Sequence, residues 1–179
     1  MDHSFRKLAD SGPAGTRNAA ASITALVAAL ALVSLPVLAT DFAFVTTTDY
    51  ETGSSAAIWL DGSHTTDIDV ASIHSDAVAR WYGGLVYVVN RTPGDNVQVL
   101  DPYGGFSTVR QFSTGNGSNP QDIAFRSDTR AYVPLYDSSE ILVVDPLTGS
   151  PVGSIDLSPF ADADGYCEVS RLFIRHDIL

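Results

Sequence analysis

Acidic residues near the C-terminus are the strongest candidates for metal chemistry in this sequence. Asp162 and Asp164 alternate with alanine ahead of a glycine, and Glu168 follows. Carboxylates in this pattern can surround a hard cation with oxygen ligands, which makes these three residues a candidate calcium site. The complete EF-hand pattern fails, because Phe160 stands at the first ligand position and Arg171 at the last. An Asp- and Gly-rich turn between two sheets is the alternative interpretation.

Other catalytic signals are missing from the sequence. It contains no Gly-x-Ser-x-Gly nucleophile elbow, no Gly-x-Gly-x-x-Gly fingerprint and no P-loop. His64 and His74 fit no zinc spacing, and the single cysteine, Cys167, excludes an intramolecular disulfide. The sequence therefore assigns no catalytic residue, and it assigns no cofactor other than calcium. Whether the protein is an enzyme stays open, with a non-catalytic role favoured.

The charge balance limits the possible partners. From Thr40 onward there are seven arginines and no lysine against 19 acidic residues, a net charge of −12. Such a chain repels phosphate backbones and anionic lipid surfaces, so we expect no nucleic-acid partner. Contact with a membrane is expected only through the N-terminal segment, if that segment is retained.

Residues 1–39 have the pattern of an export signal. Arg6, Lys7 and Arg17 precede an uncharged stretch made mostly of Ala, Leu and Val, with Ala39 as the expected cleavage position. An uncleaved membrane anchor is the alternative, because the stretch is long enough to span a bilayer. In both cases the charge order sends the residues after 40 across the membrane. The sequence therefore predicts a secreted, periplasmic or cell-surface protein.

The remainder of the chain, residues 40–179, reads as a series of short β-strands. Runs of Val, Ile, Tyr and Phe alternate with Gly, Asp, Asn, Ser and Pro. Comparable strands open at Phe44, Tyr87 and Tyr132, which are 43 and 45 residues apart. Behind the last two, a further strand ends in Asp101 or Asp145, each followed by Pro and then Gly. We expect both aspartates to accept hydrogen bonds from their own turns.

Four strands every 40 to 50 residues is the size of one propeller blade. The predicted fold class is all-β, a partial β-propeller of four-stranded antiparallel blades preceded by a signal-peptide helix. The expected blades are residues 42–75, 76–118 and 119–160, with an incomplete fourth over 161–179. The first blade lacks its inner strand, and residues 166–174 are expected to be the inner strand of the fourth.

The repeat resembles a known family. The sequences Tyr87-Val88-Val89-Asn90, Asn96 to Asp101 and Asn119 to Ala124 are similar to the Tyr-Val-Thr-Asn type β-propeller repeats of secreted and surface-layer proteins. Valine replaces the motif threonine in the second copy, and Pro-Leu replaces Thr-Asn in the third. The resemblance implies a radial array of blades, which closes with about 4 to 8 blades.

Because the sequence holds only about three blades, we expect a truncated copy of a longer propeller or a partial propeller that associates through exposed blade edges. The leading hypothesis is an exported, non-catalytic module that binds a protein or glycan partner, or acts as a scaffold, at the cell envelope or outside the cell. The alternatives are a fragment of a propeller enzyme of the hydrolase, lactonase or quinoprotein kind, which needs further blades for activity, and a gene fragment without function. Several aromatic residues either pack between sheets or line a sugar or peptide site: Trp59, Trp81, Tyr82, Tyr87, Tyr132 and Tyr136.

Overall fold

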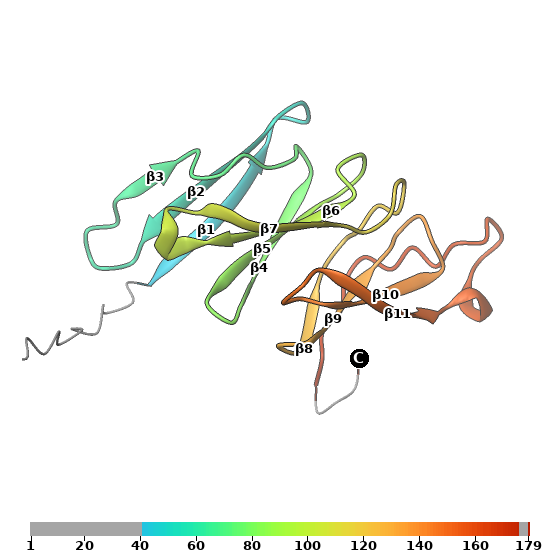
Figure 1. The fold of residues 1–179 in the computed structure, drawn as a ribbon. Coiled ribbons are helices and arrows are strands. Elements are labelled where there is room, and N and C mark those ends of the chain that lie inside the picture. The colour runs from blue at the N-terminus through green and yellow to red at the C-terminus, as the bar shows by residue number, and fades with distance from the viewer. Residues whose placement is uncertain (1–40, 176–178) are drawn as a thin grey trace, which may run out of the picture. The chain divides into compact units, whose positions relative to one another are not determined.

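The computed structural model describes residues 41–175 and 179 (Figure 1). These residues form strands in three antiparallel sheets, and their only helical elements are two short 3-10 turns, Pro102–Gly104 and Ser158–Phe160. The all-β prediction is therefore confirmed. The predicted signal segment, residues 1–39, lies outside the described part. Within that part, no helix is long and apolar enough to cross a membrane.

Each sheet is a simple meander in which strands adjacent in sequence are adjacent in space. The first sheet has three strands: β1 (Phe42–Thr48), β2 (Gly53–Trp59) and β3 (Thr66–Ile68). The second has four: β4 (Ala77–Tyr82), β5 (Leu85–Asn90), β6 (Asn96–Asp101) and β7 (Ser107–Ser113). The third has four: β8 (Ala124–Ser127), β9 (Arg130–Pro134), β10 (Glu140–Asp145) and β11 (Ser150–Asp156). They are the blades of a partial β-propeller, and the first of them has no counterpart of β4 and β8 among the described residues.

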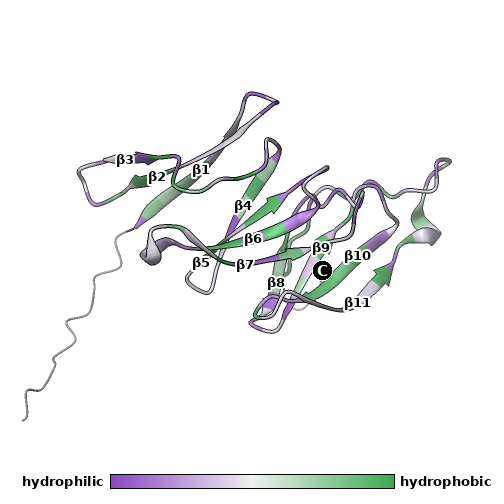
Figure 2. Cartoon of the chain, turned by 45° about the horizontal axis from the view of Figure 1, so that its top comes forward, coloured by the Kyte–Doolittle hydropathy of each residue, from purple (hydrophilic) through white to green (hydrophobic). Residues whose placement is uncertain are grey.

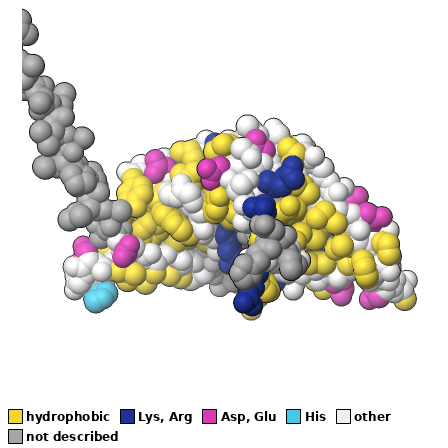
Figure 3. Space-filling view, turned by 90° about the horizontal axis from the view of Figure 1, so that it is seen from below, with side chains coloured by type: hydrophobic (Ala, Val, Ile, Leu, Met, Phe, Trp, Pro, Cys, Tyr) yellow, Lys and Arg dark blue, Asp and Glu magenta, His cyan; other side chains and the backbone are white. Residues whose placement is uncertain are grey.

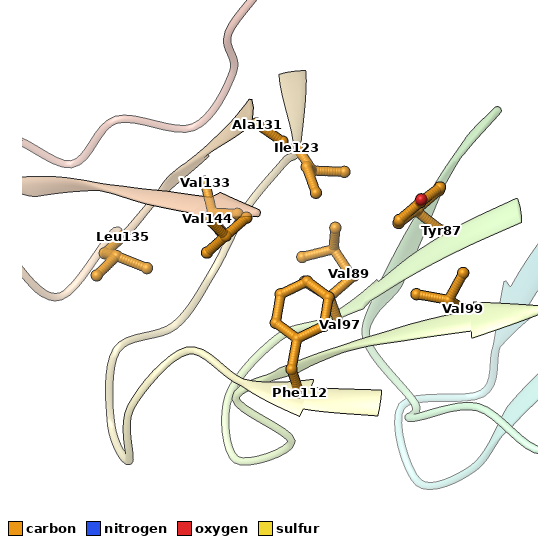
Figure 4. Close-up of a cluster of buried hydrophobic side chains, with 10 residues drawn as sticks. All are labelled: Tyr87, Val89, Val97, Val99, Phe112, Ile123, Ala131, Val133, Leu135 and Val144. Atoms are coloured by element: carbon orange, nitrogen blue, oxygen red, sulfur yellow. The ribbon is translucent and has the colours of Figure 1, made fainter. Parts of the chain in front are cut away.

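The second sheet shows why the sheets must stack. Val86 and Val88 belong to the apolar cluster shared with the first sheet, whereas Tyr87 and Val89 belong to the cluster shared with the third. Side chains of a strand alternate between the two faces, so these central strands bury both. Figure 2 shows hydrophobic residues (green) on the strands of all three sheets, and Figure 4 shows the second cluster, where Val89 and Val97 meet Val133 and Val144 from the third sheet.

The turns after β6 and β10 form as the sequence predicts. The Asp101 carboxylate accepts a hydrogen bond from the Tyr103 amide (2.9 Å), and the Asp145 carboxylate accepts one from the Leu147 amide (2.8 Å). The bonds satisfy amides that the tight turn leaves without a ladder partner. The predicted structural role of the two aspartates is thus confirmed.

The second and third sheets share an irregularity next to their outermost strands. The pairing of β6 with β7 shifts register between Val99 and Leu100, and the pairing of β10 with β11 shifts between Val143 and Val144. The two β-bulges occupy corresponding positions in the repeat. A bulge bends the strand and increases its twist.

The expectation of a strand over residues 166–174 is wrong. These residues pair with no strand in the described chain, although they lie against the third sheet. The Ser139 hydroxyl donates a hydrogen bond to the Gly165 carbonyl (2.7 Å), and the Leu172 amide donates one to the Asp122 carboxylate (3.2 Å). A β-strand requires main-chain hydrogen bonds to a neighbouring strand. Strands β4 and β8 have such a neighbour in the strand that follows each of them, whereas no described strand pairs with residues 166–174.

Candidate functional site

A cavity of about 520 Å³ lies between the first and second sheets. The start of β1 forms one wall and the end of β4 the other, and the turns after β2 and β6 close it. Its lining residues are Asp41, Phe42, Phe44, Leu60, Ala79, Arg80, Trp81, Val86 and Tyr103. Pockets of a few hundred Å³ with an apolar lining and few polar groups are typical of binding sites.

Aromatic rings form the base and rim of this cavity. The Phe42 ring meets the Trp81 ring edge-on, with centroids 5.5 Å apart, and meets Phe106 in the same way at 5.4 Å. Phe106 is buried beneath the lining, whereas Trp81 is 53% exposed and Tyr103 is 55% exposed. The cavity therefore has a packed base and a rim of exposed aromatic surface.

The wall formed by β1 also carries unpaired main-chain groups. The Leu60 amide donates to the Asp41 carbonyl (2.7 Å) and the Asp49 amide to the Thr52 carbonyl (3.4 Å), so the odd-numbered residues of β1 bond to β2. In an antiparallel pair the alternate residues direct their N–H and C=O groups to the opposite edge. Those of Phe42, Phe44 and Thr46 therefore face away from β2. No strand within residues 41–175 pairs with this edge.

A hydrogen bond links the end of β1 to the start of β4. The Thr46 hydroxyl donates a hydrogen bond to the Ala77 carbonyl (3.2 Å). The cavity lies beyond this bond, towards the start of β1 and the end of β4, where Phe42 and Trp81 line it. In the second and third sheets, an inner strand occupies the corresponding edge of β5 and β9.

Two residues of opposite charge, Arg80 and Asp41, are among those that line the cavity. The Arg80 Nε pairs with the Asp122 carboxylate at 2.8 Å, and its Nη1 donates to the Ala79 carbonyl at 2.9 Å. Asp122 is 1% exposed and belongs to the third sheet's inner segment, so a neighbouring sheet holds the guanidinium in place. Figure 3 shows arginine side chains (dark blue) interspersed with hydrophobic ones (yellow) on one face of the protein.

The structure separates the aromatic residues singled out in the sequence. Trp81 lines the cavity. Trp59 packs against Phe42, and the Trp59 indole Nε1 donates a hydrogen bond to Asp67 (2.7 Å). Tyr82 stacks on Phe125 with centroids 4.3 Å apart, and Tyr87 lies in the core. Packing between sheets is thus the role of Tyr82 and Tyr87, and Trp81 is the one that lines the cavity. Phe42, Phe44 and Tyr103 also line the cavity but were not among these aromatic candidates. The available signal was that the two phenylalanines alternate on a strand expected to have no inner neighbour.

The candidate calcium ligands lie in a turn after the third sheet. The Asp162 carboxylate accepts from the Asp164 amide (3.2 Å), and the Asp164 carboxylate accepts from the Tyr166 amide (2.9 Å). The pKa of Asp164 is lowered mainly by a side-chain hydrogen bond with Asp162, and also by the hydrogen bond from the Tyr166 amide. Glu168 instead interacts with Tyr136. The described residues contain no group of three or more His, Cys, Asp or Glu side chains arranged to hold a metal ion, and calcium binding by Asp162, Asp164 and Glu168 stays a prediction.

The contact between Glu168 and Tyr136 gives this prediction a direct test. The negative charge of Glu168 and a hydrogen bond to it raise the pKa of the Tyr136 phenol, because both oppose formation of the phenolate. We expect Glu168→Gln to lower the Tyr136 pKa towards its ordinary value in an NMR titration of the labelled tyrosine ring.

Calcium bound at Glu168 should lower the same pKa in the wild type and leave Glu168→Gln unchanged. A calcium titration that moves neither value would contradict the predicted site. Asp156→Asn is the matched control, since this exposed aspartate bonds only to Ser158 among its described contacts.

No family model matches the sequence, and no curated protein matches it significantly. Among solved structures, a glutaminyl cyclase from Myxococcus xanthus is similar over 67% of this chain and 55% of its own, with 17% sequence identity and a TM-score of 0.39. AztD from Citrobacter koseri is similar over 64% of this chain and 34% of its own, with 15% identity and a TM-score of 0.43. The apo form of AztD gives 14% identity and a TM-score of 0.42.

The chain thus spans about half of the glutaminyl cyclase and about a third of AztD. Similarity at this level assigns neither a ligand nor an activity to the chain.

Proposed function

We propose that the protein is an exported, non-catalytic module of Tyr-Val-Thr-Asn type propeller repeats that binds a protein partner. The partner contributes an extended segment, which adds to the free edge of β1 and places side chains in the cavity beside it. One observation carries this proposal: the aromatic cavity lies next to the edge at which Phe42, Phe44 and Thr46 direct their main-chain groups. Addition of a strand to an exposed sheet edge is a recurring mode of peptide recognition.

The lining of the cavity supports binding rather than chemistry. Among the described residues that line it, the ionisable ones are Asp41, Arg80 and Tyr103, and none is Ser, Cys or His. Main-chain hydrogen bonds would supply affinity at the edge, and the aromatic rings would select among side chains.

The proposal predicts a specific effect of Trp81. Peptides of about ten residues, selected from a random library on the immobilised full chain, should protect the amides of Phe42, Phe44 and Thr46 from hydrogen exchange. Trp81→Ala should weaken their binding about tenfold, because an aromatic anchor that becomes buried on binding is typically worth more than about 1 kcal/mol. Val152→Ala, at an exposed position on β11, is the matched control and should bind as the wild type.

Equal affinity of Trp81→Ala and wild type, or protection confined to other strands, would contradict the proposal. A glycan array forms the second arm of the experiment. Glycan binding that depends on Trp81 without protection of β1 amides would assign the cavity to a sugar instead of a peptide.

A further inference from the structure

The geometry points to a particular occupant for the β1 edge: residues 168–174 from a second copy of this chain. The inference rests on the proposed function, since it names the segment that the edge accepts. In the resulting pair, each copy donates its C-terminal segment to the first sheet of the other copy.

The position of the donor segment is the first observation. The Leu172 amide bonds to the Asp122 carboxylate, and that same carboxylate pairs with Arg80 of β4. The Cys167 thiol donates to the Leu157 carbonyl (3.1 Å), which fixes the segment at the end of the third sheet. The segment thus lies beside the third sheet's inner region without a ladder partner of its own, while Phe173 is exposed.

The far face of the third sheet is the second observation. The third sheet packs on one face of the second sheet, and the third sheet's own far face carries the corresponding residues of the repeat. These are Tyr132, Pro134, Ile141 and Val143, which correspond to Tyr87, Val89, Val97 and Val99 of the second sheet. The four residues of the second sheet are all buried, whereas of their counterparts in the third sheet only Pro134 and Ile141 are buried, and Tyr132 and Val143 remain partly exposed. A further sheet of the same kind therefore fits this face.

The outer face of the first sheet supplies such a partner. Ala43, Val45 and Ile58 correspond in the repeat to Val86, Val88 and Leu100, which are the residues that the second sheet presents to the first. All three are partly exposed. The interface between copies would thus repeat the two interfaces that already exist within one copy, with apolar side chains of the same type on both sides.

The unpaired strand edge and the unpaired segment complement each other in this arrangement. Strands β5 and β9 each have an inner strand at one edge, β4 and β8 respectively. When the first sheet of one copy covers the third sheet of the other, the corresponding edge of β1 lies next to the donor segment of that other copy. The segment 168–174 then takes the position of the missing inner strand and gains the ladder that it lacks. Two identical junctions close the pair by twofold symmetry.

Complementation between two variants of the full chain tests this inference. Thr46→Pro removes an N–H from the free edge of β1, where proline is tolerated, and Leu172→Pro removes the N–H that anchors the donor segment to Asp122. We expect the wild type to have twice the mass of one chain in sedimentation, and each proline variant to be a monomer. The mixture should restore a dimer, because the donor segment of Thr46→Pro and the β1 edge of Leu172→Pro are intact.

Thr46→Val and Leu172→Ala keep the N–H groups and should remain dimers. A monomeric wild type, dimeric proline variants, or a mixture that stays monomeric would overturn the inference. These outcomes separate it from the proposed function: a monomeric wild type whose β1 amides are protected by selected peptides leaves that function standing. A monomeric wild type whose β1 edge binds no peptide would contradict both the inference and the proposed function.

Discussion

Replacing Phe106 with alanine is expected to lower the free energy of unfolding by about 3–5 kcal/mol, the range for removing a buried phenylalanine. Phe106 is 4% exposed, and its ring lies 5.4 Å from Phe42, 5.6 Å from Phe44 and 6.4 Å from Trp59, measured between centroids. Its removal leaves a void between the first and second sheets, and edge-on aromatic contacts are lost in addition to buried area.

Urea unfolding of the full chain measures this effect. Tyr103→Ala is the matched control, because Tyr103 lies in the same connection after β6 as Phe106 but is mostly exposed. We expect it to change the free energy of unfolding by no more than about 0.5 kcal/mol. Similar losses for the two variants would show that the aromatic cluster does not hold the first sheet to the second. Phe106→Leu should lose less than Phe106→Ala, since it fills more of the void.

Asp122→Ala is expected to cost about 2–4 kcal/mol, because it leaves Arg80 without its partner and two amides without an acceptor. The Asp122 side chain pairs with Arg80 Nε at 2.8 Å and accepts from the amides of Ile123 (2.8 Å) and Leu172 (3.2 Å). The Arg80 side chain is 38% exposed, so solvent offsets part of the loss, which places the expectation below the upper limit for fully buried pairs.

An ion pair of the same chain with an exposed carboxylate provides the control for Asp122. Asp76 pairs with Arg91 Nη1 at 3.0 Å, but its side chain is 57% exposed. Asp76→Ala should therefore change the free energy of unfolding by no more than about 1 kcal/mol. A double-mutant cycle of Asp122→Ala with Arg80→Met isolates the pair itself. A coupling energy near zero would contradict the role assigned to this contact.

The parts of the fold that depend on local signals could be predicted from the sequence. The aspartates at the ends of β6 and β10 carry their own turn chemistry, and the regular spacing of Phe44, Tyr87 and Tyr132 marks corresponding strands of three sheets. Residues 166–174 show where such reasoning fails. Their composition suits a strand, but a ladder requires a neighbour, and a pattern of side chains does not supply one.

The cavity could not be predicted in the same way. Its walls come from Phe42 and Trp81, which are far apart in sequence, and the space between them depends on how two sheets pack. The bond between Arg80 and Asp122 has the same origin, because it joins β4 to the segment before β8. Trp81 itself was recognised as an aromatic candidate, but its exposure at a cavity is a property of packing between sheets.

The paired bulges of the second and third sheets bear on how molecules of this kind aggregate. A flat, regular rim is the usual template on which strands of separate molecules polymerise into fibrils. The kinks beside Val99 and Val143 make the rim formed by β7 and β11 a poor template of that sort. Extension of the sheets from this rim into open-ended fibrils is thereby discouraged.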